Sequence, residues 1–446
     1  MPQNGPIILR VAVPTPLRRT FDYIFPENLT KKLDGSLPLS GSRVTIEFGR
    51  RTLVALIIEV TESSDIAFEK IKPINDLLDS SPILSPDLLK LFVWAANYYQ
   101  YPIGEALFTA LPALLRKGED TELPAVKHWK VTQLGLSTGT ASLDRAPRQM
   151  ALLQFLKDKT ALPESELTGC FSATIRNQVE EKGLIESFLA QHEPQPASDE
   201  LLQQANLTLD SQQQIAMDAI ELHGFSCNLL EGVTGSGKTE IYLQAIEKTL
   251  RYNRQALVLI PEISLTPQTE KRFTDRFNTP IVSLHSGMTD KQRLEAWIKA
   301  KSGEAKIILG TRSAIFTVFD DLGLIILDEE HDSSYKQQDG FKYSARDLAV
   351  IRAQREAIPV ILGSATPSLE SLNNCIEGRY QHLTLTQRAN NATAPSWRVI
   401  DLKTEATNCG IAQSTLDAIQ QRLAAQQQVL VFLNRRGYAP ALVCHN

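Results

Sequence analysis

Cysteine is scarce in this sequence: there are five among 446 residues, and none lies close to another. An odd number of isolated cysteines argues against a disulfide framework and favours a reducing compartment, so we expect a cytoplasmic protein. Long apolar runs are also missing. No stretch of about 18 apolar residues occurs, which argues against a membrane-spanning helix and a membrane partner. The N-terminus has no basic segment followed by a long apolar core, so no signal peptide is predicted.

An excess of one charge is lacking as well, because 46 basic and 51 acidic residues leave a net charge of −5. A net acidic chain can still bind nucleic acid through a local basic groove, so the overall charge does not decide that question. The chain has 43% hydrophobic and 22% charged residues, as ordinary globular proteins have. Its length predicts roughly three domains.

Two regions precede the most regular part of the chain. Residues 1–116 mix short β-branched runs, such as a strand expected at 53–58, with turn residues and a helix at about 85–99. This pattern indicates a small α+β domain. Residues 117–195 carry three helix starts, at Pro147, Pro163 and Ser172, before a strand pair, which is the winged-helix pattern. DNA binding and a spacer or protein-docking role are equally open for this module. On its first helix we expect one apolar face, formed by Ala151, Leu152, Phe155 and Leu156.

Residues 200–405 alternate short apolar strands with helices, which indicates an α/β fold with a parallel sheet covered on both faces. Ligands of such sheets bind at the carboxyl ends of the strands. The expected strands are 227–230, 256–260, 307–309, 324–327 and 360–362. A further strand, 429–433, is expected in the last region, 406–446.

The segment 232–239 reads GVTGSGKT and fits the pattern of a nucleotide phosphate-binding loop. It follows an expected strand and opens an expected helix, as that motif requires. Glycines let backbone N–H groups surround the phosphates, and the helix N-terminus adds positive charge. We expect Lys238 to reach the β- and γ-phosphates of ATP and Thr239 to ligate magnesium. The loop consists of Gly232, Val233, Thr234, Gly235, Ser236, Gly237, Lys238 and Thr239.

A second half of this site is expected where an apolar strand ends in DEEH, at 328–331. Asp328 is the expected magnesium partner, and Glu329 the base that orients or deprotonates the attacking water. An acidic pair after a strand is by itself often only a solvated strand end. Its position downstream of a phosphate loop supports the catalytic interpretation.

The motifs of this region follow the order found in superfamily 2 helicases. They read LIPEISLTPQ at 259–268, GTRS at 310–313, DEEH at 328–331, GSAT at 363–366 and LVFLNRRG at 430–437. Together with ARDLA, FLNRRGYAP and the N-terminal VPTPLRRTFDYIFPE, they resemble the family of primosomal protein N′ (PriA), the bacterial replication-restart DNA helicases. The resemblance covers the whole chain. It implies a RecA-like helicase lobe preceded by a small α+β DNA-binding domain and a winged-helix domain.

The resemblance also implies cofactors, partners and roles for single residues. The cofactors are ATP and Mg²⁺, and the partners are forked and single-stranded DNA, other primosome proteins and single-strand-binding protein. Gln213 stands where the family's glutamine reads adenine, although its neighbour Gln212 is easily confused with it. Thr266 and Thr311 look like helix N-caps that bind DNA phosphates together with Arg312. His331 relays DNA binding to hydrolysis, or is a structural histidine.

An aromatic and basic loop lies between the DEEH and GSAT motifs. Such a composition suits stacking on single-stranded bases and pairing with phosphates, and it resembles the family's loop that couples DNA binding to hydrolysis. The alternative is ordinary packing of the rings. The residues concerned are Tyr335, Lys336, Phe341, Lys342 and Tyr343.

The N-terminal region resembles the family's pocket for the 3′-terminal nucleotide of a nascent strand. The matching positions are Phe21, Asp22, Gly41 and Lys72. A stacking ring and a hydroxyl acceptor have the chemistry that such a pocket needs. Without the resemblance, Phe21 would be interpreted as core and Asp22 as part of a turn.

The chain departs from the family near its end. Cys444 stands at the family's first zinc position, but a structural zinc needs about four ligands, so we expect Zn²⁺ only in a longer chain. The motif that carries the arginine finger is also missing, which suggests the N-terminal portion of a longer protein. The favoured function is an ATP-dependent 3′-to-5′ DNA helicase that recognises stalled or abandoned forks and initiates primosome assembly. A non-catalytic fork-binding scaffold and another superfamily 2 translocase are the alternatives.

Overall fold

The computed structural model describes residues 6–33, 36–122, 125–138, 146–157, 159, 161–190, 200–388, 396–408 and 410–432. The chain forms two compact units, residues 1–391 and 392–446. Among the described residues, no helix combines the length and the apolar character that crossing a membrane requires.

The central lobe (residues 200–388) is built on a seven-stranded sheet in which all paired strands run parallel, in the order β11-β12-β10-β13-β14-β9-β15. Five strands include those that the sequence predicts. They are β9 (Ser226–Gly232), β10 (Gln255–Leu259), β12 (Ile307–Gly310), β13 (Leu322–Leu327) and β14 (Pro359–Ser364). The two edge strands, β11 (Ile281–Leu284) and β15 (Gln381–Leu385), are not predicted.

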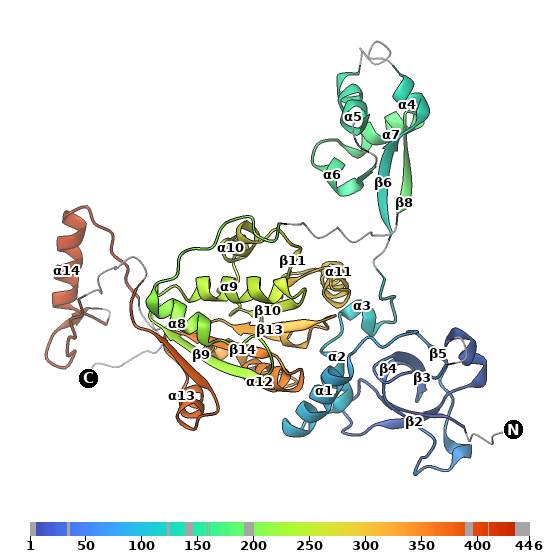
Figure 1. Ribbon diagram of the computed structural model, residues 1–446, viewed down its shortest axis with the longest axis horizontal. Coiled ribbons are helices and arrows are strands. Elements are labelled where there is room, and N and C mark those ends of the chain that lie inside the picture. The colour runs from blue at the N-terminus through green and yellow to red at the C-terminus, as the bar shows by residue number, and fades with distance from the viewer. Residues whose placement is uncertain are drawn as a thin grey trace, which may run out of the picture. The chain divides into compact units, whose positions relative to one another are not determined.

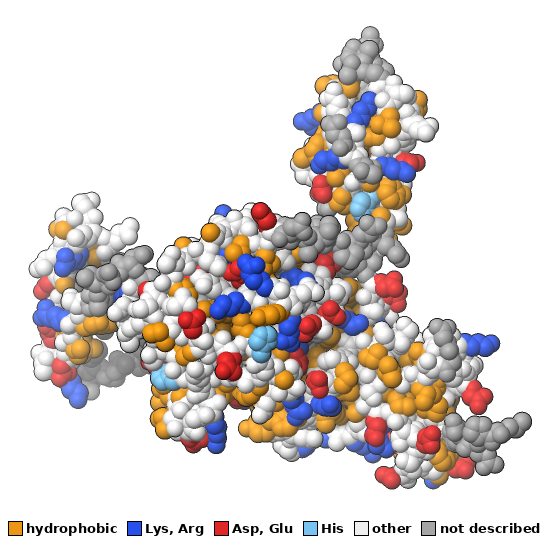
Figure 2. All heavy atoms as spheres, in the orientation of Figure 1, with side chains coloured by type: hydrophobic (Ala, Val, Ile, Leu, Met, Phe, Trp, Pro, Cys, Tyr) orange, Lys and Arg blue, Asp and Glu red, His pale blue; other side chains and the backbone are white. Residues whose placement is uncertain are grey.

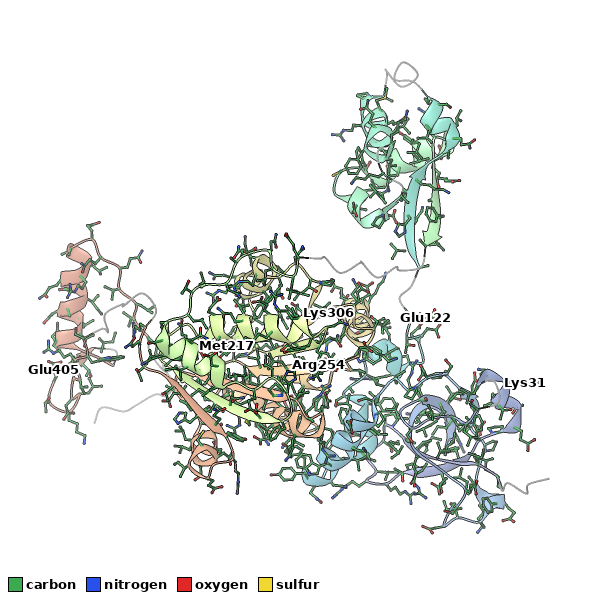
Figure 3. The ribbon with its side chains drawn as sticks, in the orientation of Figure 1. Lys31, Glu122, Met217, Arg254, Lys306 and Glu405 are labelled. Atoms are coloured by element: carbon green, nitrogen blue, oxygen red, sulfur yellow. The ribbon has the colours of Figure 1, made fainter. Side chains whose placement is uncertain are left out.

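Helices cover both faces of this sheet, as the alternation predicts (Figure 1). One face packs against α8 (Ser211–Ala219), α9 (Lys238–Arg251) and α10 (Pro267–Arg276). Met217 of α8, labelled in Figure 3, is buried in this layer. The other face packs against α11 (Asp290–Lys301), α12 (Ala345–Arg355) and the single-turn helix η4 (Arg312–Phe316). The lobe also contains η5 (Ser333–Tyr335) and α13 (Leu369–Ile376).

The N-terminal domain (residues 6–122) contains a five-stranded antiparallel sheet in the order β2-β1-β4-β3-β5. Its strands are β1 (Ile8–Ala12), β2 (Phe21–Ile24), β3 (Arg43–Phe48), β4 (Arg51–Thr61) and β5 (Asp76–Leu77), with the short helices η1 (Glu27–Leu33) and η2 (Phe68–Lys70). The predicted strand at 53–58 lies within β4. The predicted helix is α1 (Pro86–Tyr98), capped by the Ser85 hydroxyl, which accepts from Leu88 N–H.

Two helices of the N-terminal domain, α1 and α3 (Ala113–Arg116), pack directly on α12 and α11 of the central lobe. The helix α2 (Ile103–Phe108) joins the same hydrophobic cluster. Phe92 of α1 stacks on Phe316 of η4 with ring centroids 4.7 Å apart. The hydroxyl of Tyr99 accepts a hydrogen bond of 3.2 Å from the backbone N–H of Ser344. Buried side chains from both parts form a single hydrophobic cluster, so the two are joined by a shared core rather than by a linker. The sequence does not predict this contact.

Residues 125–190 form a separate small domain around Trp129, which is fully buried. Its elements are β6 (Val126–Val131), α4 (Gln133–Ser137), α5 (Pro147–Lys157), β7 (Leu162–Pro163), α6 (Glu164–Thr168), α7 (Ala173–Glu181) and β8 (Ile185–Ala190), with strand order β7-β6-β8. The three helices that the sequence predicts are present, and β6 and α4 precede them. The predicted apolar face of α5 is partly wrong, because Leu152, Leu153 and Leu156 are buried while Ala151 and Phe155 are exposed.

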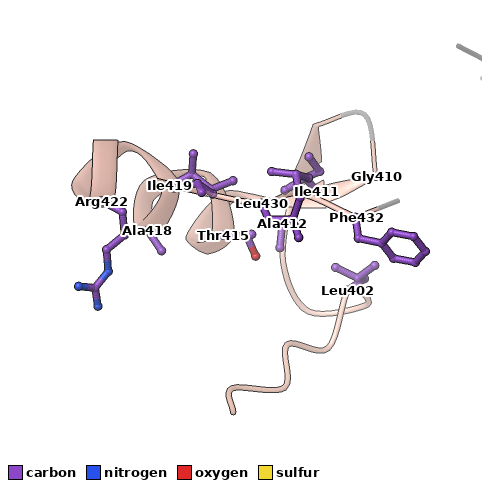
Figure 4. A pocket seen from close by; sticks show the side chains of 12 residues that line it. Leu402, Gly410, Ile411, Ala412, Thr415, Ala418, Ile419, Arg422, Leu430 and Phe432 are labelled. Atoms are coloured by element: carbon purple, nitrogen blue, oxygen red, sulfur yellow. The ribbon is translucent and has the colours of Figure 1, made fainter. Parts of the chain in front are cut away.

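The second unit contains the short hairpin β16 (Thr407–Asn408) and β17 (Ile411–Ala412), followed by α14 (Gln413–Ala424). The strand predicted at 429–433 is wrong for residues 429–432, which are irregular, and Leu433 lies outside the described residues. A parallel strand needs neighbours to accept and donate its hydrogen bonds, and none of the described residues pairs with this segment. Leu430 and Phe432 border a largely apolar cavity of about 430 Å³ beneath α14 (Figure 4).

Candidate nucleotide and DNA sites

The phosphate loop joins β9 to α9 at the carboxyl edge of the central sheet, as the motif predicts. Gly235 and Gly237 adopt φ values of +81° and +85°, a left-handed region that favours glycine. A Cβ on Gly237 would stand 2.3 Å from Nε2 of Gln213. The loop therefore has its glycines where the backbone turns and where a side chain from α8 approaches it.

Two polar groups of the loop fit a bound anion. The Lys238 ammonium donates a 2.7 Å hydrogen bond to the carbonyl of Gly232, so it is folded over the loop. The Ser236 hydroxyl is buried and has no hydrogen-bond partner among the described residues. A phosphate would offer acceptors to both groups, and unpaired buried polar atoms are otherwise unfavourable. The loop residues therefore fit the phosphates of ATP.

Gln213 lies against the loop but uses both ends of its amide within the protein. Its Oε1 accepts from the backbone N–H of Asp210 at 2.9 Å, which completes a capping box at the start of α8. Its Nε2 donates to the Ser236 carbonyl at 2.9 Å. The amide of Gln212 instead bonds to Thr386. The structure thus separates the two glutamines, and adenine recognition by Gln213 stays a prediction.

Asp328 and Glu329 follow β13, two strands away from β9 in the same sheet. The Tyr242 hydroxyl, from α9, donates a 3.1 Å hydrogen bond to Asp328. Burial, followed by the negative charge of Glu329, raises the pKa of Asp328, while the nearby Lys238 charge opposes that rise. Glu329 has φ = +49°, which is strained for a residue with a side chain and recurs at functional sites. The two motifs meet at the edge where parallel-sheet ligands bind.

No group of three or more His, Cys, Asp or Glu side chains within the described residues is arranged to hold a metal ion. Magnesium at nucleotide sites takes most ligands from phosphates and water, with only one or two protein oxygens. Thr239, in the first turn of α9, and Asp328 would supply such oxygens, and a bound magnesium would neutralise developing phosphate charge. Cys444, the zinc position, lies outside the described residues.

His331 bridges the DEEH motif to the GSAT motif. Its Nδ1 lies 2.7 Å from the Ser364 hydroxyl, and its Nε2 lies 3.3 Å from the Thr366 hydroxyl. Nδ1 also lies 3.6 Å from the Glu329 carboxylate. The histidine therefore touches both the expected base and the strand that follows, and its role as a relay or as a structural histidine stays a prediction.

Glu330 is a residue of the site that the sequence does not single out. Its side chain is fully buried and accepts hydrogen bonds from the Ser368 backbone N–H, at 2.7 Å, and from the Ser371 hydroxyl, at 3.0 Å. The Arg346 guanidinium, from the ARDLA string, lies 3.2 Å from it. Glu330 thus fixes α12 and α13 to the end of β13. The three residues after Asp328 are all ionisable, and the sequence does not indicate which of their side chains points into the core.

The aromatic loop differs from its predicted role. The rings of Tyr335, Phe341 and Tyr343 are 2%, 4% and 4% exposed, so in this structure they are not free platforms for bases, and the packing alternative holds. Phe341 stacks on Tyr101 of the N-terminal domain with ring centroids 5.2 Å apart. The Tyr335 hydroxyl donates to the Asp328 carbonyl at 2.7 Å. The two lysines of this loop, Lys336 and Lys342, are by contrast exposed.

The two expected helix N-caps differ from each other. Thr266 caps α10, because its hydroxyl accepts from the Thr269 N–H at 3.3 Å. The prediction for Thr311 needs correction: it precedes the single 3₁₀ turn η4, and its side chain makes no cap hydrogen bond. Arg312 donates to the Ser334 carbonyl at 2.7 Å and so supports the aromatic loop.

The four residues of the expected 3′-end pocket lie at different places in the N-terminal domain. Phe21 packs edge-on against Phe48, with ring centroids 5.0 Å apart. The Asp22 carboxylate accepts from Arg10 and Ser64. Successive side chains of a strand point to opposite faces, so the ring and the carboxylate do not share one surface of β2. A single pocket formed by both therefore stays a prediction.

The other two members have their own surroundings. Gly41 has φ = +94°, and a Cβ there would stand 2.5 Å from the Leu84 carbonyl oxygen. The close approach of the Leu84 backbone therefore explains why this position is glycine. Lys72 is exposed and lies 3.6 Å from the Glu47 carboxylate. No hydrogen bond or ion pair of the described residues joins these two to Phe21 or Asp22.

Two family models match the chain. The 3′ DNA-binding domain of PriA matches residues 10–112, and the DEAD/DEAH box helicase matches residues 210–375. The first match coincides with the N-terminal sheet and its helices, and the second with the central lobe. Fold and site thus define a helicase domain of the DEAD/DEAH box class that shares a core with a 3′ DNA-binding domain.

Curated relatives agree with both matches over nearly the whole chain. The Replication restart protein PriA of Haemophilus influenzae is 45% identical over 98% of this chain, and that of Bacillus subtilis is 32% identical over 96%. The chain belongs to the PriA family. It spans about three fifths of the length of these relatives, 60% and 62% respectively. The solved helicase domain of Pyrococcus furiosus Hef overlaps 40% of this chain and 38% of its own, with 21% identity and a TM-score of 0.32.

Proposed function

We propose that the chain provides the ATP-binding and DNA-end-recognising parts of an ATP-dependent DNA helicase that acts in replication restart. The observation that carries this proposal is the shared core between the N-terminal domain and the nucleotide lobe. A domain matched as 3′ DNA-binding is thereby packed on the lobe that holds the phosphate loop and the DEEH motif. The relatives named Replication restart protein PriA support the biological setting.

The residues of the site divide the work in a consistent way. Lys238 leaves the Gly232 carbonyl and pairs with the β- and γ-phosphates, and Ser236 and the loop N–H groups bind the same oxygens. Asp328, positioned by Tyr242, would hold magnesium together with Thr239. Glu329 orients and accepts a proton from the attacking water.

The contacts of His331 connect the nucleotide site to the neighbouring GSAT motif. The histidine contacts Glu329 on one side and the hydroxyls of Ser364 and Thr366 on the other. A shift of either motif changes these contacts, so nucleotide hydrolysis and the movement of neighbouring DNA-binding segments are linked. Lys336 and Lys342 bind phosphates near this network, whereas the buried rings transmit position by packing.

The finer parts of the proposal rest on family resemblance. They are translocation from 3′ to 5′, preference for stalled forks, and assembly with other primosome proteins and single-strand-binding protein. A helicase that acts on the bacterial chromosome is located in the cytoplasm. Phe21, Asp22, Gly41 and Lys72 contact the 3′ end, and Cys444 is a zinc ligand where further ligands are present.

The decisive experiment compares nucleotide and DNA binding in matched variants of the chain. Binding of labelled ATP and of a forked DNA with a free 3′ hydroxyl at the branch is measured for the unmodified chain, Lys238→Ala and Lys248→Ala. Lys248 lies exposed on the same helix and serves as the control. We expect Lys238→Ala to lose ATP binding and keep fork binding, with Lys248→Ala unchanged in both.

Two results would contradict the proposal. One is an unmodified chain that does not distinguish the fork with a free 3′ hydroxyl from the same fork with a blocked 3′ end. The other is preference for RNA over DNA in the same binding assay, which would favour a different superfamily 2 motor. Equal loss of ATP and fork binding in Lys238→Ala would mean that the lysine is structural.

A further inference from the structure

The helix α3 of the N-terminal domain packs against α11 of the central lobe (Figure 1). Two adjoining cavities lie at this contact, beside the carboxyl ends of β11 and β12. The larger, about 280 Å³, has Arg116 of α3 and Arg293 of α11 in its wall. The smaller, about 220 Å³, has Arg293 and Arg312 in its wall. Both are also lined by Ser286 and Ser313, so the two form one continuous groove.

The three arginines of this groove are held in place by backbone carbonyls rather than by carboxylates. Each donates to a backbone carbonyl: Arg116 to Leu111 at 2.8 Å, Arg293 to His285 at 2.8 Å and Arg312 to Ser334 at 2.7 Å. None of them forms an ion pair with a carboxylate in the part of the chain that the structure describes. Arg116 is exposed and Arg293 and Arg312 are half-buried. The buried arginines elsewhere form ion pairs instead: Arg43 with Asp79, Arg276 with Glu240 and Arg352 with Glu356.

Positive charge is in excess around the groove, although two carboxylates also line it. Desolvation of the Arg116 guanidinium by the groove wall, followed by the Arg293 charge, lowers the pKa of Arg116 although the residue as a whole is exposed, and Asp290 opposes this only in part. Asp290 lines the larger cavity and Glu262 the smaller, where the Glu262 carboxylate accepts a hydrogen bond from the Ser286 hydroxyl. Three guanidinium groups therefore stand against two carboxylates. Two guanidinium groups placed together on neutral anchors suit an anion that is not part of the chain. Figure 2 shows that acidic and basic side chains are otherwise interspersed over the visible face of the central lobe.

We propose that Arg116, Arg293 and Arg312 form a phosphate track that carries single-stranded DNA from the edge of the central lobe to the N-terminal domain. This inference rests on the proposed function, which supplies DNA as the ligand. It adds Arg116 and Arg293 to the motif residue Arg312 and gives the strand a path towards the N-terminal domain. Guanidinium groups bind phosphates in a bidentate manner and without reading sequence, which suits a path that every base must pass.

The position of the groove supports a strand rather than a free phosphate. It begins beside Thr311 and Arg312, at the end of β12, and reaches the helix that ends the N-terminal domain. Its walls come from elements that share one core, so the spacing of the arginines is fixed. Three positive charges along one groove suit a polyanion better than a single phosphate.

The test measures how the binding of an oligothymidylate depends on salt. Each lost phosphate contact lowers the slope of log affinity against log salt by about 0.7 for single strands. We expect Arg116→Gln and Arg293→Gln each to lower the slope by about one contact and Arg293→Lys to keep it. Lys306→Gln is the matched control, because Lys306, labelled in Figure 3, precedes β12 at the opposite edge of the same sheet.

Thermal unfolding of each variant accompanies the binding series. Should Arg293→Gln fail to fold, Arg116→Gln, whose side chain is exposed, carries the test by itself. The track is overturned if both variants bind with the slope of the unmodified chain, or if Lys306→Gln lowers the slope equally. Competition by inorganic phosphate with no change in slope would indicate an ion site and also overturn it. In each of these cases the unmodified chain still binds DNA; if it binds none, the proposed function fails as well.

Discussion

Gly237 of the phosphate loop and Gln213 of α8 lie so close together that a Cβ on the glycine would stand 2.3 Å from the glutamine Nε2. The glutamine cannot simply swing away, because its amide holds the Asp210 N–H and the Ser236 carbonyl. The loop is thus supported from outside by a side chain that is itself fixed at both ends.

This contact predicts unequal effects of two similar substitutions. Gly235→Ala and Gly237→Ala both place alanine in a left-handed conformation, at a cost of about 1–2 kcal/mol. Gly235 has open space around it, whereas Gly237→Ala also displaces Gln213 and loses its hydrogen bonds, about 1 kcal/mol each. Urea unfolding should therefore show a larger loss for Gly237→Ala, and ATP binding should fall more. Equal losses would contradict the role given to Gln213.

Two neighbouring carboxylates should separate catalysis from stability. Glu330→Gln disturbs a fully buried group that accepts three hydrogen bonds and pairs with Arg346, and should cost about 3–5 kcal/mol. Glu329 is 37% exposed, and Glu329→Gln should change stability by no more than about 0.5 kcal/mol. Denaturant unfolding measures both effects. ATP turnover on DNA, where the unmodified protein shows it, should be lost in Glu329→Gln while ATP binding remains. A stable Glu330→Gln variant would refute this assignment.

The aromatic loop offers a second matched pair. Phe341 packs against Tyr101, Phe316 and Tyr343, so Phe341→Ala should cost about 3–5 kcal/mol. The next residue, Lys342, is exposed, and Lys342→Ala should leave stability within about 0.5 kcal/mol while weakening single-stranded DNA binding at low salt. Unfolding curves and DNA titrations measure the two effects. If Phe341→Ala kept full stability and lost only DNA binding, the ring would be a base platform after all.

Alkaline pH should loosen the same region. Burial raises the pKa of Tyr343 to about 12 from its ordinary 10, with the Arg312 guanidinium opposing the rise. A raised pKa in the folded state means that the neutral phenol favours folding. Its contribution is complete below pH 10 and is lost as the pH rises towards 12. Tyr343→Phe should therefore show a flatter decline of unfolding free energy over this window than the unmodified chain. Parallel curves would exclude the burial of a neutral phenol.

The sequence predicts the strands of the central sheet according to how deeply they are buried. β10, β12 and β13 are buried at every position and appear as continuous apolar runs. The edge strands β11 and β15 are half-buried or alternate with exposed polar residues, so neither stands out from a loop. A strand at an edge is defined by its single neighbour, and that neighbour is not adjacent in the sequence.

The phosphate loop is predictable because its chemistry lies in the backbone of eight consecutive residues. Glu330 and Phe341 are not predictable in this way. Their roles depend on partners brought in by tertiary packing, Arg346 and Ser368 for the carboxylate and Tyr101 for the ring. A segment rich in aromatic and basic residues can form an exposed DNA-binding surface or a buried contact between domains. Only the packing of the N-terminal domain against this segment decides between the two.

The shared core of the N-terminal domain and the central lobe has a consequence for how the chain can be divided. Residues 125–190 lie between these two parts in the sequence, yet they bury their own tryptophan-centred core. This segment is therefore a domain inserted between two parts of one fold, and the rest of the chain should still fold when the segment is removed or replaced by an unrelated domain. A cut at residue 116, which looks like a natural boundary along the sequence, would split one fold into two halves with exposed apolar faces, and neither half should remain in solution alone.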